Sequence, residues 1–309
     1  MGEADLGFSS SCVQREEKGV VVVKIARFRV WIIFLIPAFI MIGIFFIGPA
    51  IWAIYISLTN MALTGPTALH WDFVGLANYF HIGSDSQFLT SLYVTLYFLF
   101  GSIIGQFGLG LLLAKYVENK SLFIRLSIEA VAIIAWVIPE LVGGFNWLSF
   151  LNYPGGLASI IFHISQPLLF TQPLLSVTIA NIWHGSTFSF LLFVAALDGI
   201  PKEIIESAKL DGSTAINTFL YITIPMIKNS IFTDLILITL FTMGEFTLVF
   251  SMTGGGPGMA TSLLSIYAYQ QAFSFYDISY GSAISILMLF VGMIISFGYI
   301  ILISRSNAE

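Results

Sequence analysis

The chain has 309 residues, of which 57% are hydrophobic and only 9% are charged, and its formal net charge is −5. Soluble domains average about 25% charged residues, so this composition indicates an integral membrane protein. A single cysteine, Cys12, excludes an internal disulfide, and the absence of a basic stretch argues against nucleic-acid binding.

A polar and charged segment, residues 1–29, precedes the first apolar run and is predicted to form a cytoplasmic N-terminal tail. The apolar run that follows extends from Val30 to Leu58. The apolar core of a secretory signal has only about 7–15 residues. We therefore expect a retained membrane helix rather than a signal peptide that is removed.

Several apolar stretches are long enough to cross a bilayer, because a hydrocarbon core of about 30 Å requires about 20 helical residues. They are predicted at residues 30–57, 88–114, 123–150, 173–197, 226–251 and 280–304. Residues 30–304 would then form one membrane domain, followed by a short cytoplasmic tail, residues 305–309. The expected fold is an all-α polytopic membrane protein with six transmembrane helices and both termini in the cytoplasm.

The distribution of basic residues supports this number of spans. All 12 lysines and arginines lie before span one, after span six, or in the connections between spans two and three and spans four and five, including the first three residues of spans three and five. Six spans place these segments on the same face, which the positive-inside rule assigns to the cytoplasm. The connections on the other face, roughly 58–87, 151–172 and 252–279, are too short to form an enzyme domain.

The connection between spans four and five, residues 198–225, is a polar island between apolar runs. Pro201 suits the first turn of a helix, because its missing N–H would have no partner there. Gly212 suits the left-handed stop of that helix, and Ser213 suits the N-cap of a second helix. The pattern predicts a helix-turn-helix that is either an amphipathic connector in the headgroup layer or a helix that docks into a groove of a cytoplasmic partner.

The stretch from Glu206 to Gly212, followed by Phe219, Ile222 and Ile224-Pro225, resembles the cytoplasmic loop of ABC importer membrane subunits. The family pattern there is Glu-Ala-Ala, then Asp-Gly, then Ile-x-Leu-Pro, from which this chain departs at Ser207 and Ile224. Further resemblance is specific to carbohydrate-type permeases, maltose-type first permeases in particular, which are binding-protein-dependent transport system inner membrane components. It lies in residues 73–79, 195–201, 244–246, 253–257 and 280–283.

This resemblance implies a type I ABC importer permease fold that forms half of a sugar pathway. The 198–225 loop would dock on a separate ATPase through Pro201, Ile204, Ile205, Glu206, Ala208, Asp211 and Gly212. The implied partners are a second, related but different permease, two ATP-binding subunits that hold ATP and magnesium, and an extracytoplasmic sugar-binding protein. The chain itself would bind no cofactor, catalyse no reaction, and reside in the lipid bilayer of a prokaryotic plasma membrane.

Charged side chains inside the membrane need a reason, because each costs about 2.5–3.5 kcal/mol on insertion scales. For Glu129 the reason is predicted to be an ion pair with Arg125, four residues earlier. Glu140 follows Pro139 and precedes two glycines, which predicts a broken or kinked helix. Sugars are bound by hydrogen-bonding groups and flat aromatic faces, so the pathway candidates are Glu140, Asn146, Trp147 and Glu245. Their alternative role is to hold the helices together by hydrogen bonds.

Two further observations concern ionisable groups in the predicted spans. Asp234 and Glu245 would lie on nearly one face of span five, which suggests an alternative function as an ion-gradient-driven secondary transporter. Against it, no inverted repeat is visible, and a cytoplasmic helix-turn-helix has no role in such a mechanism. His184, beside Trp183, is expected to be packed and hydrogen-bonded rather than to relay protons.

Overall fold

The structure is a computed structural model that describes residues 35–163 and 165–306. The predicted N-terminal tail, residues 1–29, lies outside this part of the chain, as do residues 307–309. The chain divides into two units, Met1–Tyr55 and Ile56–Glu309. The described part of the first unit is helical and contains a π-helical segment, η1 (Gly43–Ile47), and the beginning of α2 (Gly48–Ser57). Its apolar side chains are mostly exposed, which suits a helix in lipid.

Four described helices are long and apolar enough to cross a membrane. They are Leu35–Ser57, α4 (Ser86–Glu118), α9 (Pro173–Asp198) and most of α16 (Ile278–Ser306). Two bent helix pairs pass the same test jointly: α5 (Leu122–Val137) with α6 (Glu140–Leu151), and residues Ala215–Met226 with α13 (Lys228–Met243). The described residues therefore contain up to six spans, in agreement with the sequence.

The third span breaks where the sequence predicts. Between α5 and α6 the chain bends by 103° at Ile138-Pro139. The two glycines after Glu140 play a different role from the expected one, because they lie inside the regular helix α6. A Cβ atom on Gly144 would lie 3.0 Å from the Leu248 carbonyl oxygen, so this glycine allows α6 to approach α14 (Thr247–Thr253).

The fifth span differs from the prediction of one helix over residues 226–251. Helix α13 ends at Met243, and Gly244 to Phe246 form a break before α14. The Glu245 carboxylate explains the new helix start, since its Oε1 accepts a hydrogen bond from the Leu248 backbone N–H at 2.9 Å. Asp234 and Glu245 thus do not share a helix.

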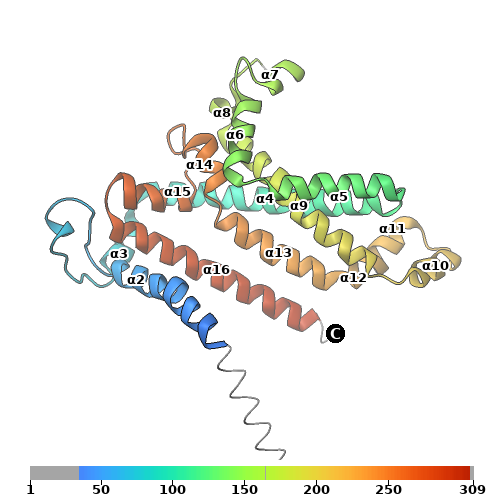
Figure 1. Cartoon of the computed structure of the whole chain (residues 1–309), viewed down its shortest axis with the longest axis horizontal. Coiled ribbons are helices and arrows are strands. Elements are labelled where there is room, and N and C mark those ends of the chain that lie inside the picture. Colours follow the sequence, from blue (N-terminus) through green and yellow to red (C-terminus); the bar gives the residue numbers. More distant parts are fainter. Residues whose placement is uncertain (1–34, 164, 307–309) are drawn as a thin grey trace, which may run out of the picture. The chain divides into compact units, whose positions relative to one another are not determined.

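The remaining elements lie at the two ends of the bundle or beside it (Figure 1). Near the ends of α4 and α16 that are remote from α10 lie η2 (Pro66–Ala68), α3 (Ala77–Ser84), α15 (Leu264–Tyr269) and η4 (Gln270–Ser274). The opposite end carries α10 (Lys202–Leu210), α11 (Ala215–Thr218), η3 (Phe219–Thr223) and α12 (Ile224–Met226). Beside the bundle stand α6, α7 (Leu157–Ile161) and α8 (Leu168–Thr171). The described residues form no strand beyond an isolated bridge between Thr59 and Phe73.

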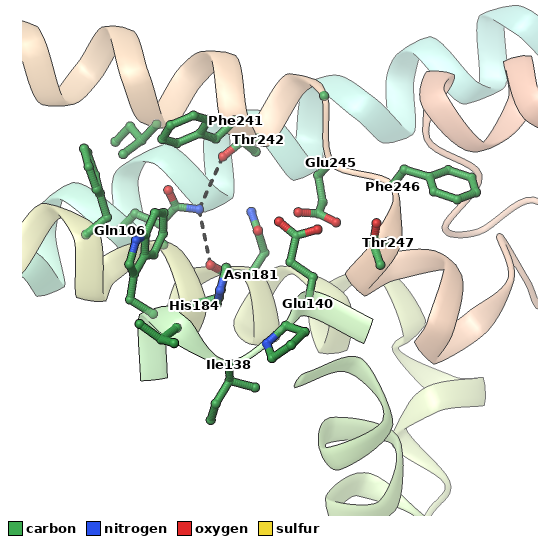
Figure 2. A pocket seen from close by; sticks show the side chains of 17 residues that line it. Gln106, Ile138, Glu140, Asn181, His184, Phe241, Thr242, Glu245, Phe246 and Thr247 are labelled. Atoms are coloured by element: carbon green, nitrogen blue, oxygen red, sulfur yellow. Dashed lines mark hydrogen bonds between the residues drawn. The ribbon is translucent and has the colours of Figure 1, made fainter. Parts of the chain in front are cut away.

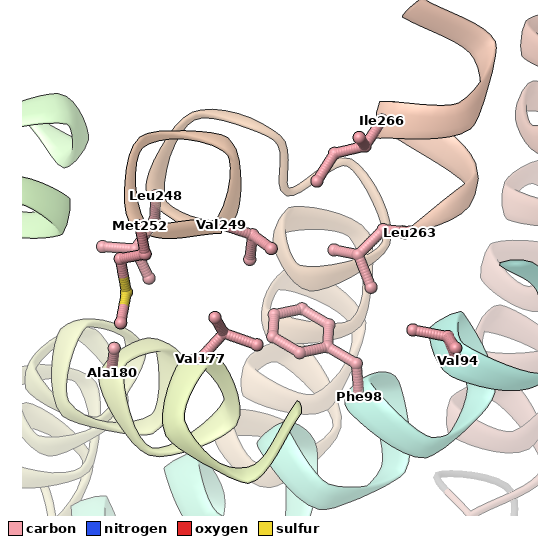
Figure 3. Close-up of a cluster of buried hydrophobic side chains, with 9 residues drawn as sticks. All are labelled: Val94, Phe98, Val177, Ala180, Leu248, Val249, Met252, Leu263 and Ile266. Atoms are coloured by element: carbon pink, nitrogen blue, oxygen red, sulfur yellow. The ribbon is translucent and has the colours of Figure 1, made fainter. Parts of the chain in front are cut away.

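The core joins helices that are distant in sequence. Phe98 of α4 is fully buried and lies among side chains of α9, α14 and α15 (Figure 3). The other members of this cluster are Val94, Val177, Ala180, Leu248, Val249, Met252, Leu263 and Ile266. This packing holds the break between α13 and α14 against α4 and α9.

Candidate functional site

A cavity of about 460 Å³ lies where the α5–α6 bend meets the α13–α14 break. Both irregularities remove backbone from regular helix, and such backbone is tolerated at membrane depth where it faces protein or a water-filled cavity. Helices α4 and α9 supply the remaining wall. The polar side chains that line the cavity are Gln106, Glu140, Asn181, His184, Thr242, Glu245 and Thr247.

Two carboxylates define the cavity chemically. Glu140 projects from the first turn of α6, and Glu245 projects from the α13–α14 break, so that the two groups face each other (Figure 2). Glu245 is only 7% exposed and is positioned by the Leu248 N–H. Its backbone carbonyl also accepts a hydrogen bond from the Ser265 hydroxyl at 2.5 Å. The structure therefore brings together two of the four predicted pathway residues.

Two amide side chains and a histidine complete the wall. The Gln106 Nε2 donates to the backbone carbonyl oxygen of Asn181 and to the Thr242 hydroxyl, both at 3.3 Å. The Asn181 side chain is 4% exposed, yet its Nδ2 has no hydrogen-bond partner among the described residues. Leaving a buried donor unsatisfied costs about 1–3 kcal/mol, so a ligand oxygen beside Asn181 would be favoured.

His184 is packed and hydrogen-bonded to the Trp136 backbone, as expected, but one of its two ring nitrogens has no partner among the described residues. Its ring stacks on Trp136, with centroids 5.2 Å apart and planes at 19°. The His184 Nε2 has no hydrogen-bond partner among residues 35–163 and 165–306. The ring thus presents an unpaired nitrogen in the wall of the cavity.

The other two predicted pathway residues, Asn146 and Trp147, lie in a second cavity of about 560 Å³. It shares only Ile138 with the first cavity, and its walls are more aromatic. Trp147 meets Trp183 edge to face, with ring centroids 6.0 Å apart. The predicted set is therefore divided between an acidic chamber and an aromatic one that adjoin at Ile138.

Asp234 lies outside both cavities. It is fully buried in α13, and neither carboxylate oxygen has a hydrogen-bond partner among the described residues. Asp234 and Glu245 therefore do not line the same described cavity, and nothing in their arrangement favours the secondary-transporter hypothesis. Within the described ranges, no group of three or more His, Cys, Asp or Glu residues could hold a metal ion.

The polar island has the predicted helix-turn-helix shape with one difference in its capping. Helix α10 has Pro201 at its N-cap, and Gly212 has a φ of 79°, as a left-handed stop requires. Thr214, rather than Ser213, caps α11 by accepting a hydrogen bond from the Asn217 N–H at 3.3 Å. The Ser213 hydroxyl instead accepts a hydrogen bond from Thr218.

The surface of α10 combines a shallow groove with exposed apolar residues. Ala208 is buried within this chain, whereas Leu210 is 88% exposed. Of the predicted contact residues, Ile205 is half-buried and Pro201, Ile204, Glu206, Asp211 and Gly212 are exposed. The groove, of about 370 Å³, is lined by Glu203, Ile204, Ser207, Ala208, Asp211 and Ile222. The end of the bundle thus offers an amphipathic surface suited to a protein partner.

Comparison with known proteins identifies the architecture. Residues 106–307 match the family of binding-protein-dependent transport system inner membrane components. The chain belongs to this family. It is an ABC transporter permease with several membrane-spanning helices, and the resemblance found in its sequence is confirmed.

Individual relatives cover most of this permease. It is 30% identical to the sulfoquinovosyl glycerol transport system permease protein SmoG of Agrobacterium fabrum, over 89% of this chain and 91% of the relative. It is 32% identical to the trehalose/maltose transport system permease protein MalF of Thermococcus litoralis, over 82% of this chain and 86% of the relative.

The fold is also that of solved importers. The permease superimposes with a TM-score of 0.73 on a chain of a bacterial ABC transporter involved in the import of the acidic polysaccharide alginate, at 21% identity. The match covers 92% of this chain and 98% of the other. The predicted type I importer permease fold is therefore confirmed.

Sequence reasoning missed Gln106 and Asn181. Both are uncharged amides inside apolar spans, where only charged side chains stand out clearly from the sequence. A signal was present, because amides at membrane depth also tend to hydrogen-bond across helices. Their shared cavity depends on the packing of α4 against α9, which the sequence pattern does not specify.

Proposed function

We propose that this permease is one half of the translocation pathway of an ATP-driven importer of sugars or sugar derivatives. The single observation that carries the proposal is the family match over residues 106–307. The polar cavity supports it, because carboxylates accept and an amide donates the hydrogen bonds that sugar hydroxyl groups make. The names of relatives, which include trehalose/maltose and sulfoquinovosyl glycerol permeases, support a sugar-type solute.

The proposed complex contains a second permease, a related but different chain, two ATP-binding subunits and an extracytoplasmic sugar-binding protein. It resides in a prokaryotic plasma membrane with the α10 end in the cytoplasm. This chain catalyses no reaction and binds no cofactor, since ATP and magnesium belong to the ATP-binding subunits. Closure of those subunits moves residues 198–225, and the spans then rock so that the pathway opens alternately to either side.

The proposed coupling residues have different roles, depending on how exposed each side chain is. Ile204 and Ile205 contact the ATPase together with the exposed face of α10. Ala208 forms the floor of the small groove, and Glu206 and Asp211 orient the docked partner. Pro201 and Gly212 set where the helix begins and ends.

The test is to purify the tagged permease with the products of neighbouring genes and to measure ATP hydrolysis with and without sugar-loaded binding protein. Stimulated hydrolysis is expected. A Gly212→Val variant should lose this stimulation, because a β-branched residue strongly disfavours a φ near 79°. Gly83→Val is the matched control, since a Cβ atom there meets nothing within 4 Å and its φ is ordinary. Uptake driven by a proton or sodium gradient and indifferent to ATP would contradict the proposal.

A further inference from the structure

The charge of the transported solute is left open by family membership, because the names of relatives include both a sulfoquinovosyl glycerol and a trehalose/maltose permease. We propose that the cavity between α6 and the α13–α14 break selects neutral or positively charged sugars and excludes anionic ones. This inference rests on the proposed function as a sugar importer. It assigns Glu140 and Glu245 as the residues that determine specificity for charge.

The first observation is the one-sided charge of the cavity. Two carboxylates face each other across it, from α6 and from the α13–α14 break (Figure 2). No lysine or arginine is among the described residues that line it. Even a carboxylate pair that shares one proton keeps one negative charge. A phosphate or sulfonate group in this cavity would meet like charge without a compensating cation.

The second observation is an unsatisfied donor in the same wall. The Asn181 side chain is 4% exposed and lines the cavity, and its Nδ2 has no hydrogen-bond partner among the described residues. Figure 2 shows this amide beside the two glutamates. A sugar hydroxyl can accept a hydrogen bond from Asn181 and donate one to a carboxylate. The wall therefore matches a neutral polyol, and an amino sugar would add an attraction to the carboxylates.

A purely structural role explains the pair less well. Glu245 caps α14 through Leu248, a task that a neutral glutamine oxygen could also perform. Glu140 makes no side-chain hydrogen bond within residues 35–163 and 165–306, so no hydrogen bond between the described helices depends on it. An ionisable side chain at membrane depth that lines a cavity and has no hydrogen-bond partner among the described residues points to a function in the pathway.

The experiment uses the complete importer with its binding protein in proteoliposomes. Stimulation of ATP hydrolysis is first screened with maltose, trehalose, glucosamine, glucose 6-phosphate and sn-glycerol 3-phosphate. A neutral or amino sugar is expected to stimulate. If an anionic compound stimulates best, the charge selection is wrong while the importer function stands. If none of these compounds and no other sugar stimulates, the proposed function fails and the inference fails with it.

Variants then test the two glutamates. In the double variant Glu140→Gln/Glu245→Gln, the ratio of glucose 6-phosphate uptake to glucose uptake should rise at least about tenfold. This change corresponds to about 1.4 kcal/mol. Glu140→Asp should keep the wild-type ratio because it keeps the charge. Asp72→Asn is the control, since it removes a charge from an exposed position outside the cavity.

If the double variant does not assemble, Glu140→Lys replaces it, because no hydrogen bond among the described residues depends on Glu140 and the lysine adds a positive charge that offsets Glu245. An unchanged ratio in an assembled variant would return both glutamates to a structural role.

Discussion

At the scale of single residues, Asp85 lies just before the α4 span and joins three helices, α4, α15 and α16. It is the N-cap residue of α4, and its Oδ2 accepts hydrogen bonds from the hydroxyl groups of Tyr267 and Tyr280, both at 2.6 Å. Its Oδ1 accepts a third, from the Gln87 N–H at 2.9 Å. Burial alone would raise the pKa of Asp85, but these hydrogen bonds outweigh it and lower the pKa below its ordinary value of 3.8.

This lowered pKa predicts the pH dependence of stability. Because the folded-state pKa of Asp85 lies below the unfolded-state value, its stabilisation is complete above pH 3.8 and is lost as the pH falls through the folded-state pKa. Thermal unfolding of the detergent-purified protein, followed by fluorescence on both sides of this pH, measures it. The Asp85→Asn variant should lose this part of the pH dependence, and an identical slope in both proteins would contradict the assignment.

The same contact predicts a matched pair of tyrosine variants. Tyr280→Phe removes one hydrogen bond to a partly exposed carboxylate and should destabilise the fold by about 1 kcal/mol. Tyr93→Phe removes the hydroxyl of a 69% exposed side chain and should leave the unfolding temperature almost unchanged. Equal shifts in the two variants would show that the loss of the hydroxyl itself, rather than its bond to Asp85, is responsible.

Single residues also show how far the sequence leads toward the site. The ion pair between Arg125 and Glu129 follows from their spacing, and the structure confirms it at 2.7 Å. The meeting of Glu140 with Glu245 could not be derived, because it depends on a bend in one span and a break in another. The break itself depends on a side chain capping a backbone N–H, a contact that helical periodicity does not reveal.

At the scale of elements, α4 and α9 pack closely because of glycine. A Cβ atom on Gly110 would lie 2.5 Å from the Ser189 Cβ and 2.9 Å from the Phe190 backbone nitrogen. Backbone cannot move aside as a side-chain end can, so small residues at such contacts set the distance between membrane helices. On the same helix, a Cβ atom on Gly108 would meet nothing within 4 Å.

These two glycines form a matched test of the packing. Gly110→Ala should force the helices apart and destabilise the protein by about 1–3 kcal/mol, the usual effect of overpacking. Gly108→Ala should be neutral or stabilising by up to about 1 kcal/mol, because alanine has the higher helix propensity. Thermal unfolding and the yield of assembled complex would measure both variants. A Gly110→Ala protein as stable as Gly108→Ala would refute the close contact.

Element boundaries followed from the sequence where backbone chemistry decides them. Pro139 lacks an N–H, and α5 indeed ends just before it. Gly212 was predicted to adopt a left-handed conformation and does so. The choice between Ser213 and Thr214 as the cap of α11 could not be settled in this way, because both hydroxyls suit an N-cap and only the local chain path decides between them.

At the scale of the whole molecule, the apolar stretches and the basic residues were sufficient to predict the membrane architecture. Lipid leaves few alternatives to helices for an apolar chain of this length. The polar island, residues 198–225, could also be predicted, because a polar helical segment is easily distinguished from the apolar spans on either side. Which face of α10 meets a partner depends on packing within the loop, which buries Ala208 and leaves Leu210 exposed.

One side chain connects this island with a distant span. Arg125 of α5 donates from Nε to Glu129 at 2.7 Å and from Nη1 to Asp198 at 2.9 Å. Its Nη2 also donates to the second Asp198 oxygen. Asp198 is the last residue of α9, just before α10, so one guanidinium joins span three to the base of the proposed coupling loop.

Replacing this guanidinium should weaken the coupling of ATP hydrolysis to transport. Lysine keeps the charge but cannot form the paired contacts with Asp198 while also binding Glu129. The Asp198 side chain is half-exposed, so the loss is about 1 kcal/mol, equivalent to a roughly fivefold change in an equilibrium. We expect Arg125→Lys to retain ATP hydrolysis while solute uptake per ATP falls several-fold.

Lys120→Arg is the control, because it exchanges the same two residue types away from Asp198. The Lys120 ammonium lies over the Tyr116 ring, 4.3 Å from the ring centroid. A parallel fall of hydrolysis and uptake would indicate misassembly, and an unchanged ratio of uptake to hydrolysis would show that the coupling loop moves independently of span three.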